Sequence, residues 1–132
     1  MKKYQYQIIR YIHDHFTGEY INVGVVVYSK EHRFLASMTS NRYQRVTQMF
    51  PEADGKWIVS LLVNFNQQIQ RISRDLVTLF TPPETLDSIT SSILIQDNGS
   101  IQFTESKLAV DVSLEAAIDD LFHTLVVKYI PK

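Results

Sequence analysis

Arg10 and Asn22 are polar residues inside two strand-like segments, Y-Q-Y-Q-I-I-R-Y-I and G-E-Y-I-N-V-G-V-V-V-Y. If residues 14–18 form the loop between the segments, paired positions sum to about 32, which places Arg10 opposite Asn22 at ~5 Å. Gly24 lies two positions further along the same face, and its missing side chain would leave room above the sheet. The forked donors of Arg10 suit a carboxylate, a phosphate or the backbone of a partner. Together with Glu19, these residues predict a small polar binding pocket.

The same arginine and asparagine also have a purely structural interpretation. A buried amide without partners costs about 1–3 kcal/mol, and buried polar side chains in proteins are nearly always hydrogen-bonded. Arg10 and Asn22 would then satisfy each other inside the sheet and bind nothing else. Alanine substitutions distinguish the two interpretations, because only a pocket predicts a loss of binding that is separable from a loss of folding.

The turn His13-Asp14-His15 contains imidazole and carboxylate groups, which are side chains that bind zinc. Three adjacent ligands in a turn lack a fixed fourth partner, and the remaining histidines, His32 and His123, stand elsewhere in the chain. We therefore expect solvated turn residues at this position, with no metal and no cofactor.

Asp97, Glu105 and Lys107 form a second candidate for metal chemistry. An acidic residue followed by E-x-K on a neighbouring strand resembles a metal-dependent nuclease core, where carboxylates hold magnesium and lysine polarises the attacking water. However, Asp97 abuts the predicted hairpin tip at 98–99, and this pairing would direct it away from Glu105. The sequence therefore favours structural or solvated roles for these residues.

Arginines occur in two pairs at i,i+3 spacing, Arg42 with Arg45 and Arg71 with Arg74. Each pair would share one helix face and could meet an acidic partner or a nucleic-acid backbone. Nearby acidic residues weaken the positive field, so a solvated helix face is the default interpretation.

Motifs of the common enzyme classes are missing from this sequence. Its four glycines, at positions 18, 24, 55 and 99, form neither a phosphate-cradling loop nor a dinucleotide fingerprint. No G-x-S-x-G or H-E-x-x-H sequence occurs. These observations argue against a standard hydrolase, kinase or dehydrogenase, and we assign no catalytic residue.

The composition is that of an ordinary globular domain. The 132 residues are 45% hydrophobic and 20% charged, which fits one domain over residues 1–132. Thirteen basic and fourteen acidic side chains give a net charge of −1, which argues against non-specific nucleic-acid binding. The absence of cysteine excludes disulfides and thiolate nucleophiles. No signal-like stretch and no apolar run of ~18 residues occurs, so we expect a soluble cytoplasmic protein.

The elements that must position these residues follow from the apolar spacing. Alternation over residues 3–13 and the apolar run at 20–28 predict a long hairpin, followed by a shorter strand at 33–39. Apolar residues at three- and four-residue spacing predict a long helix that Asp54 caps and a last helix that starts near Ser113.

Shorter elements complete this pattern. The sequence predicts a helix at 41–50, a helical turn at about 84–91 and a hairpin around 98–99. The prediction is an α+β fold, with an antiparallel sheet of about five strands covered on one face by the long central helix and the C-terminal helix.

The two opening segments resemble the amino-terminal signature of a bacterial family catalogued as domain of unknown function 3037. The later layout is also similar, with a final helix like S-L-E-A-A-I-D-D-L-F-H-T-L-V. The family has no established activity, so the resemblance implies no catalytic residue. Its members are often encoded beside a HipA-like serine kinase, which implies a toxin–antitoxin or defence context. The matching positions in this chain are Arg10, Gly18, Glu19, Asn22, Gly24 and Asp54.

Three hypotheses of function follow. The leading one is a non-enzymatic binding or regulatory module that acts on a protein partner, for which the HipA-like kinase is a candidate. The second is a small metal-dependent nuclease or hydrolase built on the acidic residues. The third is a nucleic-acid-binding domain that uses the arginine faces, and the steep salt dependence of phosphate contacts would distinguish it from the first.

Overall fold

The hairpin of β1 (Lys2–Asp14) and β2 (Glu19–Ser29) is the framework of the sheet. The computed structural model describes residues 1–93, 95 and 99–129. β3 (Phe34–Thr39) pairs with β2, whereas β4 (Ile101–Phe103) and β5 (Lys107–Asp111) pair with different parts of β1. The strand pairs are antiparallel, and the predicted α+β fold with a five-stranded antiparallel sheet is confirmed.

Three of the predicted helix starts carry side-chain caps, at Asp54, Thr85 and Ser113. Asp54 accepts a hydrogen bond from the Trp57 amide at 3.0 Å, as predicted, and Ser113 accepts one from the Ala116 amide at 3.2 Å. Each cap satisfies an amide that has no partner inside its helix, which stabilises the helix by about 1 kcal/mol. No helix within the described residues is long and apolar enough to cross a bilayer. The helices are α1 (Tyr43–Met49), α2 (Gly55–Leu76), α3 (Leu86–Thr90) and α4 (Leu114–Leu125), and a 3₁₀ turn (Val127–Tyr129) follows them.

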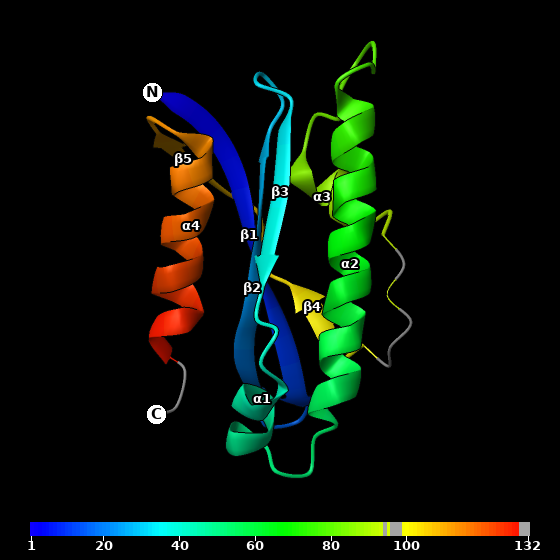
Figure 1. Ribbon diagram of the computed structural model, residues 1–132, viewed down its shortest axis with the longest axis vertical. Coiled ribbons are helices and arrows are strands. Elements are labelled where there is room, and N and C mark those ends of the chain that lie inside the picture. The colour runs from blue at the N-terminus through cyan, green and yellow to red at the C-terminus, as the bar shows by residue number, and fades with distance from the viewer. Residues whose placement is uncertain (94, 96–98, 130–132) are drawn as a thin grey trace.

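The two large helices, α2 and α4, cover opposite faces of the sheet (Figure 1). α2 packs on the face that carries Val26 and Tyr28, and α4 packs on the face that carries Val25 and Val27. The expectation that both helices lie on one face is therefore wrong. All four of these β2 residues are 0% exposed, and apolar side chains that point both ways require an apolar cover on each side.

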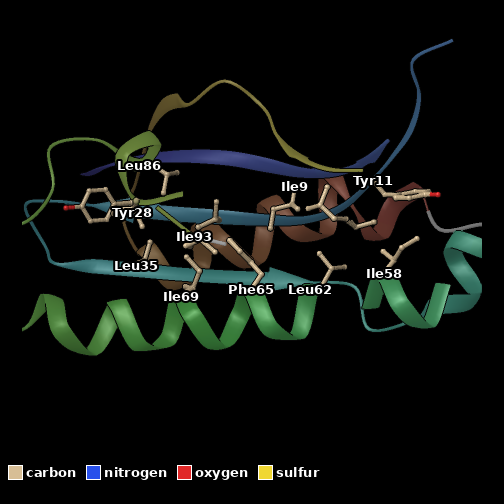
Figure 2. Packing of buried hydrophobic residues seen from close by; sticks show 14 of the residues in the cluster. Ile9, Tyr11, Tyr28, Leu35, Ile58, Leu62, Phe65, Ile69, Leu86 and Ile93 are labelled. Carbon is tan, nitrogen blue, oxygen red and sulfur yellow. The ribbon is translucent and has the colours of Figure 1, made fainter. Parts of the chain in front are cut away.

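The larger core lies between the sheet and α2. Figure 2 shows Ile58, Leu62, Phe65 and Ile69 of α2 directed toward the sheet, and all four are at most 2% exposed. Their spacing is the predicted amphipathic stripe. Burial of side chains of this size stabilises a fold by about 1.5–3 kcal/mol each, so α2 is a principal support of the hairpin.

The hairpin contains a register shift at the position of its polar pair. Ile9 pairs with Gly24 but Arg10 pairs with Asn22, so Val23 is an extra residue on β2. An extra residue of this kind is a β-bulge, which interrupts the strict alternation of side chains between the two faces. Val23 is buried in the core under α2, whereas the Asn22 side chain bonds to the end of α4.

Gly24 does not leave the open space that we expected above the sheet. A Cβ atom at this position would lie 2.8 Å from the Met38 carbonyl oxygen and 3.1 Å from Ile9 Cδ1. Because Ile9 belongs to the core under α2, the prediction that Gly24 shares a face with Asn22 is wrong. The bulge at Val23 is the physical reason, and the glycine instead permits the close approach of β3.

Two local expectations have other outcomes. The hairpin predicted around 98–99 and the strand before it involve residues 94 and 96–98, which lie outside the described residues. β5 was not among the strands that the sequence predicted. Its Leu108 is 81% exposed and its Val110 is 50% exposed, so these apolar side chains belong to neither core.

We expect Gly24→Ala to destabilise the fold by about 1–3 kcal/mol, because the added methyl group must displace β3 or the Ile9 side chain. Urea unfolding followed by circular dichroism measures this difference. A midpoint equal to that of the wild-type protein would show that β3 moves to accommodate the methyl group without a loss of stability.

Candidate functional site

A pocket of about 400 Å³ lies where the β1–β2 hairpin meets α1 and the end of α4. The predicted pairing of Arg10 with Asn22 is confirmed by the strand register, and both residues line this pocket. The remaining lining residues come from β1, β2, α1 and α4 and are Ile8, Tyr20, Ile21, Arg45, Met49 and Leu125.

Arg10 is held by two contacts that fix the plane of its guanidinium. Its Nε donates a hydrogen bond to Asn22 Oδ1 at 3.1 Å, and its Cζ lies 4.2 Å from the centre of the Tyr20 ring. Asn22 Nδ2 in turn donates to the Leu125 carbonyl at 2.9 Å. A cation–π contact at a partly exposed site contributes about 0.5–1 kcal/mol. The asparagine and the tyrosine therefore orient Arg10 at the pocket.

Arg45 is the second cation of the pocket and is almost completely buried, at 1% exposed. Its terminal nitrogens donate to the Asn22 carbonyl and, at 3.0 Å, to the Val126 carbonyl. Its Nε is buried without a hydrogen-bond partner among the described residues. Arg45 therefore connects α1 to β2 and to the end of α4 through backbone carbonyls.

The charge of Arg45 is only partly compensated in the part of the chain that the structure describes. Its pKa is lowered because burial removes water from the guanidinium. The C-terminal end of α4, where Val126 accepts from Arg45, carries a partial negative charge of about −0.5. Among the described residues, no carboxylate forms an ion pair with Arg10 or Arg45. The pocket therefore combines hydrogen-bond donors with excess positive charge.

Sequence reasoning placed Arg45 incorrectly on a solvated helix face together with Arg42. The structure separates the two: Arg42 is exposed in the N-cap position before α1, whereas Arg45 is buried. The signal that could have indicated burial is the adjacent Val46, an apolar residue of the same short helix that is 3% exposed. Arg71 and Arg74 are exposed on α2, as predicted.

The other predicted site residues that the structure describes do not line the pocket. Glu19 is exposed at the start of β2 and accepts a hydrogen bond from Thr17 Oγ1 at 3.1 Å. Gly24 faces the core on the opposite side of the sheet. Glu105 is exposed in the loop before β5, and Lys107 is exposed at the first position of that strand. Asp97 lies outside the described residues, so the nuclease-like combination has no described geometry.

His13 is not the solvated turn residue that the sequence predicted. It lies in β1, its ring stacks on Phe50 with centroids 4.2 Å apart, and its side chain is 16% exposed. Its Nδ1 is 3.0 Å from the Tyr11 hydroxyl and its Nε2 is 2.6 Å from Glu52 Oε1. The described residues contain no cluster of three His, Cys, Asp or Glu side chains that could hold a metal. His13 therefore ties the segment after α1 to the hairpin.

Comparison with known proteins identifies a family. A family model described as "Protein of unknown function (DUF3037)" matches residues 6–126, which is nearly the whole chain and includes Arg10, Asn22 and Arg45. The chain therefore belongs to this family. Searches of curated proteins and of solved structures find no match.

The hydrogen bond between His13 and Glu52 should make the free energy of unfolding depend on pH under acidic conditions. This bond is the main reason that the pKa of Glu52 is lowered from 4.5. Because the pKa of Glu52 is lower in the folded state, its carboxylate adds to the free energy of unfolding at a pH above the unfolded-state pKa. This stabilisation is lost as the pH falls through the folded-state pKa. We expect wild-type protein to be more stable than Glu52→Gln at neutral pH, and the difference to shrink as the pH falls below 4.5.

Urea unfolding of both proteins from about pH 3 to about pH 7 measures this difference. Glu105→Gln, which removes an exposed carboxylate before β5, is the control for the general loss of one negative charge. A difference between wild type and Glu52→Gln that stays constant into acid contradicts the assignment.

Proposed function

We propose that this member of the DUF3037 family is a non-enzymatic binding or regulatory module of the bacterial cytoplasm. It acts on a protein partner, and the pocket of Arg10, Asn22 and Arg45 receives an anionic group of that partner. The single observation that carries the proposal is the buried guanidinium of Arg45, which lines the pocket without a carboxylate partner among the described residues.

Burial of the Arg45 charge carries a desolvation cost. The effective cost of taking one ion out of water in a protein is several kcal/mol, and a partner of opposite charge normally offsets it. Arg45 has two carbonyl oxygens and the end of α4 as partners, which satisfy donors but supply only partial negative charge. An anion that enters the pocket would supply the missing charge.

Arg10 offers hydrogen-bond donors at the same pocket. Its Nε is engaged by Asn22, and neither terminal nitrogen has a hydrogen-bond partner within the described residues. The two terminal N–H groups of a guanidinium match the two oxygens of an anion in a bidentate pair. Because Tyr20 and Asn22 fix the orientation of Arg10, little side-chain entropy is lost on binding.

The identity of the partner follows from the family resemblance and is part of the proposal. A HipA-like serine kinase encoded beside such genes is the first candidate, which would place the protein in a toxin–antitoxin or defence system. A docked acidic group on the partner would meet Arg10 at the rim, and the neighbouring exposed Met49 would contact the surrounding surface.

Co-purification from the native host, followed by calorimetric titration of the purified partner, tests this function. We expect Arg10→Ala to weaken partner binding about tenfold to a hundredfold, because a hydrogen bond to a charged group contributes about 1.5–3 kcal/mol. Arg71→Ala, which removes an exposed arginine of α2 outside the pocket, should bind as the wild type does.

Circular dichroism and urea unfolding verify that each variant is folded. Absence of any stoichiometric partner would contradict the proposal. Equal affinities of wild type and folded Arg10→Ala for the recovered partner would show that the partner binds elsewhere on the surface.

A further inference from the structure

We infer that the anion bound between Arg10 and Arg45 is a phosphate monoester rather than a carboxylate. This inference rests on the proposed function and specifies the chemistry of the same pocket. It is carried by the number of positive charges, by the free donors and by the apolar walls around them.

The charge of the pocket distinguishes the two kinds of anion. Arg10 donates to the side chain of Asn22 and Arg45 donates to its backbone carbonyl, so the two guanidinium groups are neighbours. Together they carry two positive charges, which the end of α4 offsets by about one half. A carboxylate supplies a single negative charge, whereas a phosphate monoester supplies about −1.5 to −2 at neutral pH. The monoester matches the pocket more closely.

The donors are distributed in a way that suits a tetrahedral anion. The terminal fork of Arg10 has no hydrogen-bond partner in the part of the chain that the structure describes, and it can hold two oxygens of the anion. Arg45 is 1% exposed, so it acts mainly through its field, which is weakly screened because water is excluded around it. The third oxygen of a phosphate would therefore lie toward Arg45, a position that a planar two-oxygen carboxylate leaves empty.

The walls of the pocket are suited to the rest of a phosphorylated group. Half of the lining residues are apolar, namely Ile8, Ile21, Met49 and Leu125, and the volume of about 400 Å³ exceeds that of the anion alone. Such walls can pack against the aliphatic or aromatic stem that carries the phosphate. The same chemistry is present in a phosphorylated protein side chain and in a small phosphorylated molecule, and the experiment must distinguish these sources.

Calorimetric titration of the full chain tests the inference with four probes: inorganic phosphate, acetate, a phosphoserine peptide and the same peptide without phosphate. We expect phosphate to bind at least tenfold more tightly than acetate. Affinity for the phosphoserine peptide should fall several-fold between about pH 7.5 and pH 5, because the second pKa of a phosphate monoester is about 6 and the dianion is lost. A phosphopeptide that binds more tightly than inorganic phosphate assigns the group to a protein, and the reverse order assigns it to a small molecule.

Met49 offers a matched pair of variants at the rim of the pocket. It is 46% exposed, so a polar side chain of similar length fits without loss of core packing. Met49→Glu places a carboxylate beside the arginines and should reduce phosphate affinity at least tenfold, whereas Met49→Gln should change it less than twofold. Arg10→Lys keeps the charge but lacks the fork, and it should also bind more weakly.

Three results would overturn the inference: acetate that binds as tightly as phosphate, affinity that is equal in Met49→Glu and Met49→Gln, or no phosphate binding by folded wild-type protein. The proposed function fails separately. If phosphate binds at Arg10 but no protein partner does, the pocket chemistry stands and the module does not act through a protein. If a partner without phosphate binds through a carboxylate, the proposed function stands and the inference of a phosphate monoester is wrong.

Discussion

Asn22 makes the three hydrogen bonds on which the arrangement of the pocket depends. Its Oδ1 accepts from Arg10 of β1, its Nδ2 donates to the Leu125 carbonyl at the end of α4, and its own carbonyl accepts from Arg45 of α1. The elements β1, β2, α1 and α4 therefore meet at this one residue. Because both ends of the Asn22 side chain are engaged, an apolar replacement would leave Leu125 without its donor and Arg10 without its orienting acceptor.

The bulge at Val23 explains how a polar residue can occupy the middle of a doubly buried strand. Without the extra residue, the alternation of β2 would not place Val23 in the core under α2 while Val25 and Val27 pack under α4. The irregularity therefore keeps Ile21 and Val23 in the apolar core under α2, while Asn22 is directed to the end of α4 on the other face. Bulges commonly redirect a side chain in this way.

Much of this arrangement could be predicted from the sequence, but not all of it. Pairing of Arg10 with Asn22 followed from the position of the loop, and the Asp54 cap followed from helix chemistry. Burial of Arg45 was missed, because the adjacent Val46 is only a weak signal, the burial depends on the place where the end of α4 lies, and i,i+3 arginines on a helix are more often solvated. The apolar run of β2 implied that helices cover both faces of the sheet, and the expectation of helices on one face ignored that implication.

Hydrogen bonding and charge are separate requirements for a buried cation, and the pocket fulfils the first more fully than the second. The Asn22 and Val126 carbonyls satisfy donors of Arg45, but a carbonyl dipole supplies only partial negative charge, and Nε remains without a partner among the described residues. A carboxylate in the fold would have fulfilled both requirements and filled the site. Carbonyl partners allow the chain to fold around Arg45 while its positive charge stays available. Under the proposed function, the same contacts that hold α1 to α4 also keep the pocket receptive to an anion.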